Sequence, residues 1–299
     1  MKIIFSGVPL FSKELKISFE NKDKINRYLY LNIKTNLLNR IRFYFHILTA
    51  DILFVNYVDS DYMRSVDFAL FLRKKVILSW IGTDVLNATP LIKQKLFNKN
   101  YINKTFHTTN STWLQEELSD INIKAKYLTI FIYKNKYRDI TMPNKFIVLT
   151  YIAKGREVFY GIDTIIRLAK DLSHIEFNIA GIDKYPNIPS NINLLGWVDM
   201  DKEYEKSIVY IRCPEHDGES HSILDALSYG KVVFYNKNYP FVNYIDDYDN
   251  LKQGIEDTLL QYTSNKLIPN YKAIEYIKDR YNFDKVYKEY MNLFNELHK

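Results

Sequence analysis

Two aspartates separated by seven residues form the clearest chemical pattern in the chain. Asp217 and Asp225 lie within Pro214–Val233, a segment typical of a strand end, a polar loop, a helix starting near Ser220 and a new strand after Gly230. The first backbone N–H groups of such a helix have no partner within it, and the helix dipole adds partial positive charge there. The pattern therefore predicts a pyrophosphate site at this helix start.

The two carboxylates suit a sugar ligand. A carboxylate accepts two hydrogen bonds at once, which matches the neighbouring hydroxyls of a ribose or a hexose. The alternative is a solvated loop followed by a helix that carries an ordinary exposed acid. If the segment is functional, Asp217 is a candidate catalytic residue. The candidate donor-binding residues of the segment are Gly218, Ser220, His221, Ser222 and Asp225.

A basic turn follows the first predicted strand of the second half of the chain. It contains Lys154 and Arg156 on either side of Gly155. A guanidinium forms paired hydrogen bonds with phosphate oxygens, so Arg156 is chemically suited to a diphosphate, and Lys154 would add charge. A solvated basic turn explains the same residues.

The segment around the two aspartates resembles the C-terminal-domain signature of family-4-like GT-B glycosyltransferases, as found among bacterial surface-polysaccharide transferases. In that signature Glu, seven residues and Glu are followed by Ala, a short apolar helix turn, Gly and a strand. Here both acids are Asp, and Leu224–Gly230 supplies the rest. The resemblance implies that Asp217 faces the transferred sugar and that Asp225 contacts the nucleotide ribose. The shorter acids depart from the family pattern.

The resemblance extends to two other parts of the second half. The Arg156 turn is similar to the Gly-Arg turn that holds the donor pyrophosphate in this family, although Tyr160 stands where a Lys is expected. Gly181 and the pair Trp197–Val198 resemble the positions that receive the base. Simple strand-ending glycines would also explain these positions.

The first half contributes one further match. Trp80–Asp84 resembles the Trp-x-Gly-Thr-Asp segment of bacterial surface-polysaccharide transferases, which implies that Asp84 lies near the acceptor and takes its hydroxyl proton. A helix cap or a structural acid is the competing interpretation. Gly7, after the first strand, would let the backbone approach a donor phosphate, or would serve only a turn. His107 is expected to be a packed core residue.

Composition narrows the class of protein. The 299 residues are 47% hydrophobic and 25% charged, which is typical of a folded chain of two ordinary domains. The single cysteine, Cys213, excludes an internal disulfide framework. The net charge of +6 indicates an anionic partner, but the dispersed basic residues match no nucleic-acid motif. We therefore expect no nucleic-acid partner. The family resemblance implies a nucleotide-diphosphate sugar as donor substrate, with no metal and no cofactor.

The hydrophobic pattern predicts an α/β protein with two parallel-sheet halves and a cleft between them. The resemblance implies that this is the GT-B architecture, with two Rossmann-like domains facing across the cleft. Apolar strand-like runs alternate with amphipathic segments in both halves, separated by a polar linker at 133–145. We expect an N-terminal acceptor-side domain at 1–140 and a nucleotide-sugar-binding domain at 141–275. A C-terminal helix at 276–299 would pack back on the first domain.

Several alternatives stay open at this point. Asp59-Ser60-Asp61 has the Asp-x-Asp pattern that binds a divalent metal in GT-A glycosyltransferases. The same residues equally fit a helix cap. A nicotinamide dehydrogenase and a serine hydrolase lack their glycine motifs here. A degenerate GT-B partner subunit in a glycosylation complex is the serious non-enzyme alternative. It is suggested by the two aspartates and by Tyr160 in place of Lys.

The expected location is cytoplasmic. No uninterrupted apolar run approaches the roughly 20 residues of a spanning helix. The basic, amphipathic segment Asn39–His46 would rest on an anionic membrane at its inner face, which would suit a lipid-linked saccharide acceptor. A core helix explains the same residues.

Overall fold

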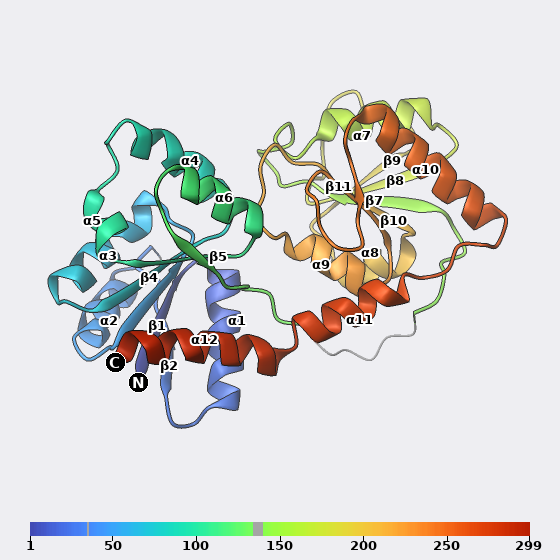
Figure 1. The fold of residues 1–299 in the computed structure, drawn as a ribbon. Helices are drawn as coiled ribbons and strands as arrows, with labels where there is room; N and C mark the ends of the chain where they lie inside the picture. Colours follow the sequence, from blue (N-terminus) through green and yellow to red (C-terminus); the bar gives the residue numbers. More distant parts are fainter. Residues whose placement is uncertain (35, 134–139) are drawn as a thin grey trace. The chain divides into compact units, whose positions relative to one another are not determined.

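A computed structural model describes residues 1–34, 36–133 and 140–299 (Figure 1). These residues form two units. Unit 1 contains Met1–Ile132, His216–Glu219 and Phe283–Lys299, and unit 2 contains Tyr133–Glu215 and Ser220–Asn282. Part of the predicted linker, residues 134–139, lies outside the described residues.

The sheet of unit 1 is entirely parallel, and within the described residues it has six strands in the order β2-β1-β3-β4-β5-β6. Its central strands are continuous apolar runs because helices cover both faces of a parallel sheet. The strands are β1 (Lys2–Gly7), β2 (Arg27–Tyr30), β3 (Ile52–Asn56), β4 (Lys75–Trp80), β5 (Phe106–Thr109) and β6 (Ala125–Tyr127).

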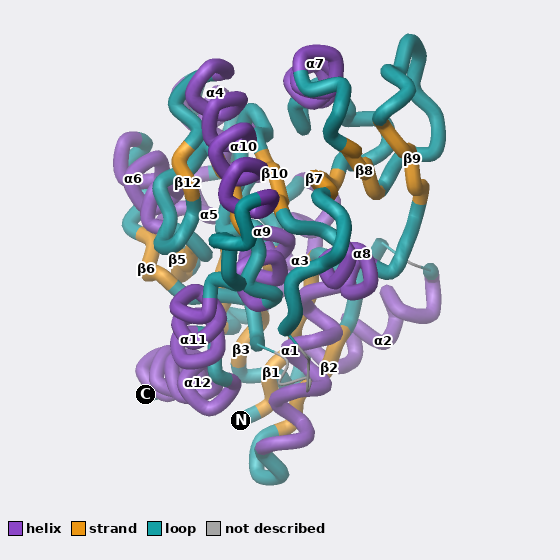
Figure 2. The backbone as a smooth tube through the Cα atoms, turned by 90° about the vertical axis from the view of Figure 1, so that its right-hand side faces the viewer, coloured by secondary structure: helices purple, strands orange, loops and turns teal. Residues whose placement is uncertain are grey.

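Two apolar layers hold the helices of unit 1 against this sheet. On one face, α1 (Pro9–Lys22) and α12 (Phe283–His298) bury Phe19 and Tyr290 against Phe5 and Phe54, so that α12 lies beside β1 (Figure 2). The other face is covered mainly by the helices between β2 and β6. These are α2 (Leu37–Ile47), α3 (Ser60–Phe71), α4 (Thr83–Lys93), α5 (Lys99–Asn103) and α6 (Thr112–Asp120).

The sheet of unit 2 is also parallel, with the order β12-β11-β10-β7-β8-β9 among the residues described. Its strands are β7 (Ile147–Tyr151), β8 (Glu176–Ala180), β9 (Ile192–Gly196), β10 (Val209–Arg212), β11 (Val232–Tyr235) and β12 (Asn243–Tyr244). Its helices are α7 (Ile162–Asp171), α8 (Met200–Lys206), α9 (His221–Ser228), α10 (Tyr248–Thr263) and α11 (Tyr271–Arg280).

The predicted α/β class with two Rossmann-like sheets is confirmed. One predicted element is wrong in detail: the C-terminal segment 276–299, expected as one helix, contains the end of α11 and all of α12, which are interrupted at Tyr281 and Asn282. Tyr281 is buried; its N–H still donates to the Ile277 carbonyl of α11, whereas its own carbonyl accepts from the Tyr133 N–H outside the helix.

Helix α2, which contains Asn39–His46, has one buried apolar side and one exposed apolar side. Phe43 and Ile47 of α2 are fully buried, whereas Ile41 and Phe45 are 56% and 71% exposed. Among the described residues, no helix combines the length and the apolar character needed to cross a membrane.

The packing of α12 leads to a stability prediction. Phe294 is fully buried and lies 6.3 Å from Phe5 between ring centroids. We expect Phe294→Ala to lower the free energy of unfolding by about 3–5 kcal/mol, because it leaves a cavity against the sheet. Urea denaturation followed by circular dichroism measures the change. The exposed Phe45→Ala is the control and should stay within about 0.5 kcal/mol of wild type. Equal effects of the two substitutions would contradict the burial of α12.

Candidate functional site

Strand order locates a candidate site in unit 2. The chain runs outward from β7 through β8 to β9, and then returns to the other side of β7 to form β10 and β11. The connections from β7 and β10 therefore leave in opposite directions. In open α/β sheets this switch point opens a crevice at the carboxyl ends of the strands, where ligands bind.

The loops after β7 and β10 pack closely at this switch point. Glu215 donates its backbone N–H to the carbonyl of Phe159 at 2.9 Å. Gly161, the N-cap of α7, has φ of +79°, and a Cβ there would lie 2.7 Å from the Cys213 Sγ. Glycine is required at this position both for its backbone conformation and for the close approach.

Arg156 is the better placed cation of the predicted basic turn. Its guanidinium carbon lies 4.0 Å from the ring centroid of Phe159, a cation–π contact that restricts its rotamers. The described residues include no hydrogen-bond acceptor for its side chain, so its N–H donors remain available to an anion. Lys154 instead pairs with Asp183 at 3.1 Å, and this hydrogen bond lowers the pKa of the Asp183 carboxyl.

Helix α9 begins at the carboxyl end of β10, as predicted. Its N-cap, Ser220, makes no side-chain cap hydrogen bond, and the Ser220 Oγ lies 2.9 Å from the Ser222 Oγ. Asp225 is partly exposed on the same helix. Its charge helps to raise the pKa of Tyr204, after burial and Tyr210, so Asp225 lies near that phenol. The Tyr204 hydroxyl donates to the Ser222 carbonyl at 3.1 Å.

The predicted base-binding positions follow β8 and β9. Gly181 has φ of +97°, and a Cβ there would lie 2.2 Å from the Ile152 carbonyl oxygen, so close backbone packing explains this glycine. Trp197 is 87% exposed directly after β9. Val198 beside it is half-buried. An exposed tryptophan at a ligand edge offers a flat apolar surface with an N–H donor.

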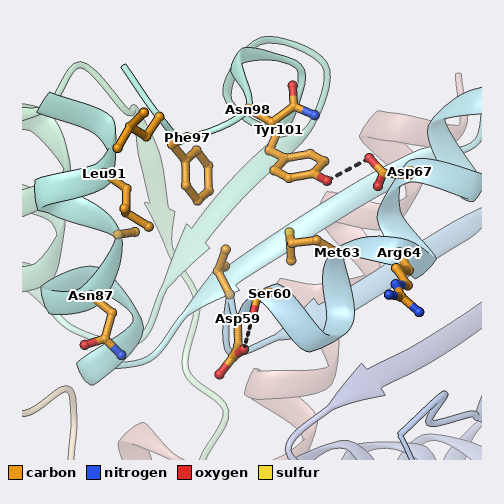
Figure 3. Close-up of a pocket in the computed structure, with 13 residues that line it drawn as sticks. Asp59, Ser60, Met63, Arg64, Asp67, Asn87, Leu91, Phe97, Asn98 and Tyr101 are labelled. Carbon is orange, nitrogen blue, oxygen red and sulfur yellow. Dashed lines mark hydrogen bonds between the residues drawn. The ribbon is translucent and has the colours of Figure 1, made fainter. Parts of the chain in front are cut away.

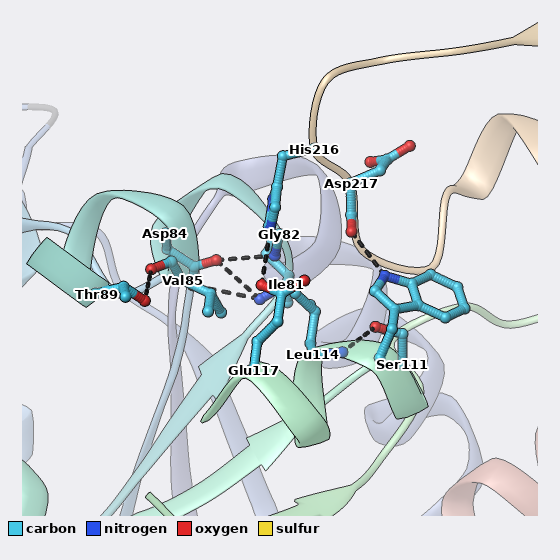
Figure 4. A network of polar contacts seen from close by, with 11 residues as sticks. Ile81, Gly82, Asp84, Val85, Thr89, Ser111, Leu114, Glu117, His216 and Asp217 are labelled. Carbon is cyan, nitrogen blue, oxygen red and sulfur yellow. Dashed lines mark hydrogen bonds and ion pairs between the residues drawn. The ribbon is translucent and has the colours of Figure 1, made fainter. Parts of the chain in front are cut away.

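The loop His216–Glu219 belongs to unit 1, and polar contacts join it to α6 (Figure 4). The Trp113 Nε1 donates to the Asp217 carbonyl at 2.8 Å, and His216 Nε2 lies 2.8 Å from Glu117 Oε2. The carboxylate of Glu219 is buried and accepts hydrogen bonds from the hydroxyls of Tyr127 and Thr129, each at 2.9 Å.

A close backbone contact joins this loop to the turn after β4. A Cβ on Gly218 would lie 2.2 Å from the Ile81 carbonyl oxygen, and a Cβ on Gly82 would lie 2.9 Å from the Gly218 nitrogen. Gly82 also has φ of +146°. Only glycines allow this approach. The structure therefore brings together two segments that the sequence predicted separately, the Asp84 turn and the Asp217 loop.

The two predicted catalytic acids have different surroundings. The Asp217 side chain is partly exposed and points away from the Trp113 indole (Figure 4). Asp84 is 1% exposed, and its carboxylate accepts from the backbone N–H groups of Val58, Ile81 and Gly82 at 2.8–3.3 Å. These hydrogen bonds tie the turns after β3 and β4 together, a contact that a structural acid would make.

Several other predicted residues have clear structural roles. Gly7 has φ of +106° and packs on β3, where a Cβ would lie 1.8 Å from the Asn56 carbonyl oxygen. His107 is buried and accepts from the Trp80 Nε1 at 3.1 Å, as expected of a core residue. Asp59 caps α3 by accepting from the Asp61 N–H.

Unit 1 has a pocket of its own, of about 550 Å³, at the carboxyl ends of β3 and β4 (Figure 3). Aromatic and aliphatic side chains form its walls, and polar side chains lie among them. The Tyr101 hydroxyl donates to Asp67 at 2.7 Å. The lining includes Asp59, Met63, Arg64, Asp67, Asn87, Leu91, Phe97, Asn98 and Tyr101. Sequence reasoning missed this pocket, because its residues come from three helices and the loops beside them, without a shared motif.

Of the predicted site residues, those of the second half from Lys154 to Val198 and from Ser220 to Asp225 lie at the carboxyl edge of unit 2. Asp217 and Gly218 lie with Asp84 in unit 1. Sequence analysis did not single out Glu219 and Trp113, which anchor the loop His216–Glu219. An acid that directly precedes a helix start was the available signal for Glu219.

Comparison with solved structures identifies the fold. Sucrose-phosphate synthase from Thermosynechococcus elongatus aligns with a TM-score of 0.73 at 10% identity, covering 99% of each chain. The pneumococcal O-GlcNAc transferase GtfA, solved with UDP and GlcNAc, aligns with a TM-score of 0.63 at 14% identity over 87% of this chain. A variant of S. aureus TarM, solved with fondaparinux, alpha-GlcNAc-glycerol and UDP, aligns with a TM-score of 0.62 at 13% identity over 86% of this chain.

The chain has the GT-B fold. It spans 60% of the length of GtfA and 59% of that of the TarM variant. No protein-family model matches the sequence, and no curated protein matches it.

The burial of Asp84 leads to a prediction about pH. Burial raises the pKa of the Asp84 carboxyl from 3.8 to about 6, against the lowering effect of the backbone N–H groups. The native state then binds this proton more tightly than the unfolded state. The contribution of Asp84 to stability is therefore complete below about pH 4 and decreases by about 3 kcal/mol as the pH rises through 6.

Urea denaturation of wild type and Asp84→Asn across this pH range tests the prediction. The asparagine cannot titrate, so the stability difference between the two proteins isolates the carboxyl group. The advantage of wild type should shrink as the pH rises. A growing advantage would show that the backbone N–H groups outweigh burial and lower the pKa.

Proposed function

We propose that this protein is a metal-independent glycosyltransferase of the hexosyltransferase kind. It would move a sugar from a nucleotide-diphosphate sugar to a saccharide or lipid-linked saccharide acceptor in surface glycan synthesis. The observation that carries the proposal is the start of α9, whose N-cap Ser220 lacks a side-chain cap, at the switch-point edge that also carries Arg156. GtfA and the TarM variant, which share the fold, were solved with UDP.

The donor would lie on unit 2. The first N–H groups of α9 and the guanidinium of Arg156 would hold the diphosphate, and Asp225 would accept hydrogen bonds from the ribose hydroxyls. Trp197 would contact the base. During transfer, the bond from the anomeric carbon to the diphosphate oxygen breaks, and the diphosphate leaves with the electron pair. The same cation and helix start would stabilise the charge that develops on it.

The acceptor would bind unit 1. The pocket beside Phe97 and Tyr101 suits a saccharide, since aromatic faces pack on the apolar side of a sugar while Asp59, Asn87 and Asn98 reach its hydroxyls. The bond formed joins the acceptor oxygen to the anomeric carbon, and the acceptor proton passes to a base. Asp84 remains our predicted base. Its pKa of about 6 suits that role, whereas its burial favours holding the turn.

A degenerate partner subunit is the second candidate. Aspartates in place of both glutamates favour it, as do Tyr160 in place of Lys and the buried position of Asp84. Such a protein would bind a nucleotide weakly or not at all and would turn over no donor.

Ligand-induced stabilisation tests donor binding. We expect one member of a nucleotide-sugar panel to raise the thermal midpoint of wild type, because a ligand at about 100 times its Kd adds about 2.7 kcal/mol to native-state stability. Asp225→Ala should fold and lose most of this shift. Asp257→Ala on α10, an exposed acid of the same unit, is the matched control and should keep it. A panel that gives no shift on wild type contradicts donor binding.

Turnover separates the two candidate functions. Asp217 would contact the transferred sugar, so Asp217→Asn should lower the rate of donor consumption by about 100-fold or more and leave the donor-induced thermal shift near wild type. The rate of donor consumption is measured by assaying the free nucleotide diphosphate that the reaction releases. A wild-type protein that binds donor and never releases the diphosphate with any acceptor tested would support the partner subunit instead.

A further inference from the structure

A second pocket of unit 1, of about 630 Å³, carries excess positive charge. Its lining residues are Ile33, Lys34, Arg40, Tyr44, Ser60, Asp61 and Arg64. Three of these side chains are cationic and one is anionic. Lys34 pairs with Asp61, and Arg40 donates its Nε–H to the Ile33 carbonyl at 2.9 Å. Arg64 is exposed and forms no hydrogen bond or ion pair with the part of the chain that is described. The pocket therefore suits an anion with several oxygens, such as a phosphate.

An exposed apolar stripe lies on the helix that forms one side of this pocket. Successive helix residues are about 100° apart, which places five apolar side chains of α2 and of the residue after it within one third of the helix circumference. All five are more than half exposed. They are Leu37, Leu38, Ile41, Phe45 and Leu48. The buried residues Phe43 and Ile47 occupy a different side of the helix, so packing on unit 1 does not account for the stripe.

Three regions follow one another along unit 1. They are the stripe, the basic pocket, and the pocket beside Phe97 and Tyr101, which we call the saccharide pocket. Arg40 and Tyr44 belong to α2 and also line the basic pocket. Ser60 and Arg64 of α3 line both the basic pocket and the saccharide pocket. A ligand that crosses these three regions in order would have an apolar chain, a phosphate and a sugar.

We infer that the basic pocket binds the phosphate of a lipid whose chains lie in a membrane, while the exposed stripe of α2 enters the lipid surface. Charge complementarity selects this occupant: the pocket is cationic, Arg42 adds a further exposed charge on the same helix, and an anionic leaflet attracts such residues. The further role of this lipid as the carrier of the acceptor sugar rests on the proposed function. The binding itself does not.

Vesicle sedimentation tests the inference with the full chain and no sugar donor, so its outcome is independent of transferase activity. The vesicles contain phosphatidylcholine with or without phosphatidylglycerol. We expect partition onto the anionic vesicles. Arg42→Gln, which removes a charge outside the pocket, should weaken binding about five-fold, the effect of one cation near the surface. Arg40→Gln and Arg64→Gln should each weaken it several-fold more, because each also loses direct hydrogen bonds to the phosphate.

A matched leucine pair tests the stripe. Leu38 and Leu260 are 72% and 68% exposed on helices of different units. Leu38→Ser should weaken vesicle binding about ten-fold or more, because it removes a side chain that enters lipid, whereas Leu260→Ser should have no effect. Circular dichroism and the thermal midpoint confirm that each variant is folded.

Three results would overturn the inference. The first is the absence of binding to anionic vesicles. The second is an equal loss from Arg40→Gln and Arg42→Gln, which would indicate general surface charge without a phosphate site. The third is a protein that does not bind vesicles but is stabilised by inorganic phosphate, with that stabilisation lost in Arg64→Gln. That result would assign the pocket to a soluble phosphate.

Discussion

The buried carboxylate of Glu219 is the interaction on which the candidate site most depends. It accepts from Tyr127 and Thr129 in unit 1, and α9 of unit 2 begins two residues later along the chain. A buried carboxylate is costly unless hydrogen bonds satisfy it, so both hydroxyls are needed to keep it in place. With Glu219 held, the position of Asp217 is set by short stretches of backbone. The acid proposed to meet the sugar thus depends on residues that touch no ligand.

The fold was predictable because its signals are local. The β1, β3 and β4 runs are mostly apolar, as expected of buried parallel strands. Gly161 lies at the start of α7, and Gly230 lies just after the end of α9. The candidate residues of unit 2 could also be singled out from the sequence. They lie in the segments that follow β7, β8, β9 and β10, and the carboxyl ends of parallel strands share one edge of the sheet.

The features that escaped prediction depend on long-range contacts. Gly218 needs to be glycine because Ile81 is beside it, and the two positions are 137 residues apart in the sequence. The Asp84 carboxylate had two plausible roles, and only its burial and its N–H partners favour one. The amphipathic pattern of α2 contains two apolar sides, and the sequence alone could not indicate which one faces the core.

The setting of Cys213 has a practical consequence for experiments on this protein. It is the only cysteine of the chain, it packs against Gly161, and burial raises the pKa of its thiol to about 11. Alkylating reagents attack the thiolate, which is scarce at neutral pH when the pKa is this high. The native thiol should therefore react only slowly with maleimides. A cysteine introduced at an exposed position would accept a fluorophore or spin label selectively, without prior removal of the native thiol.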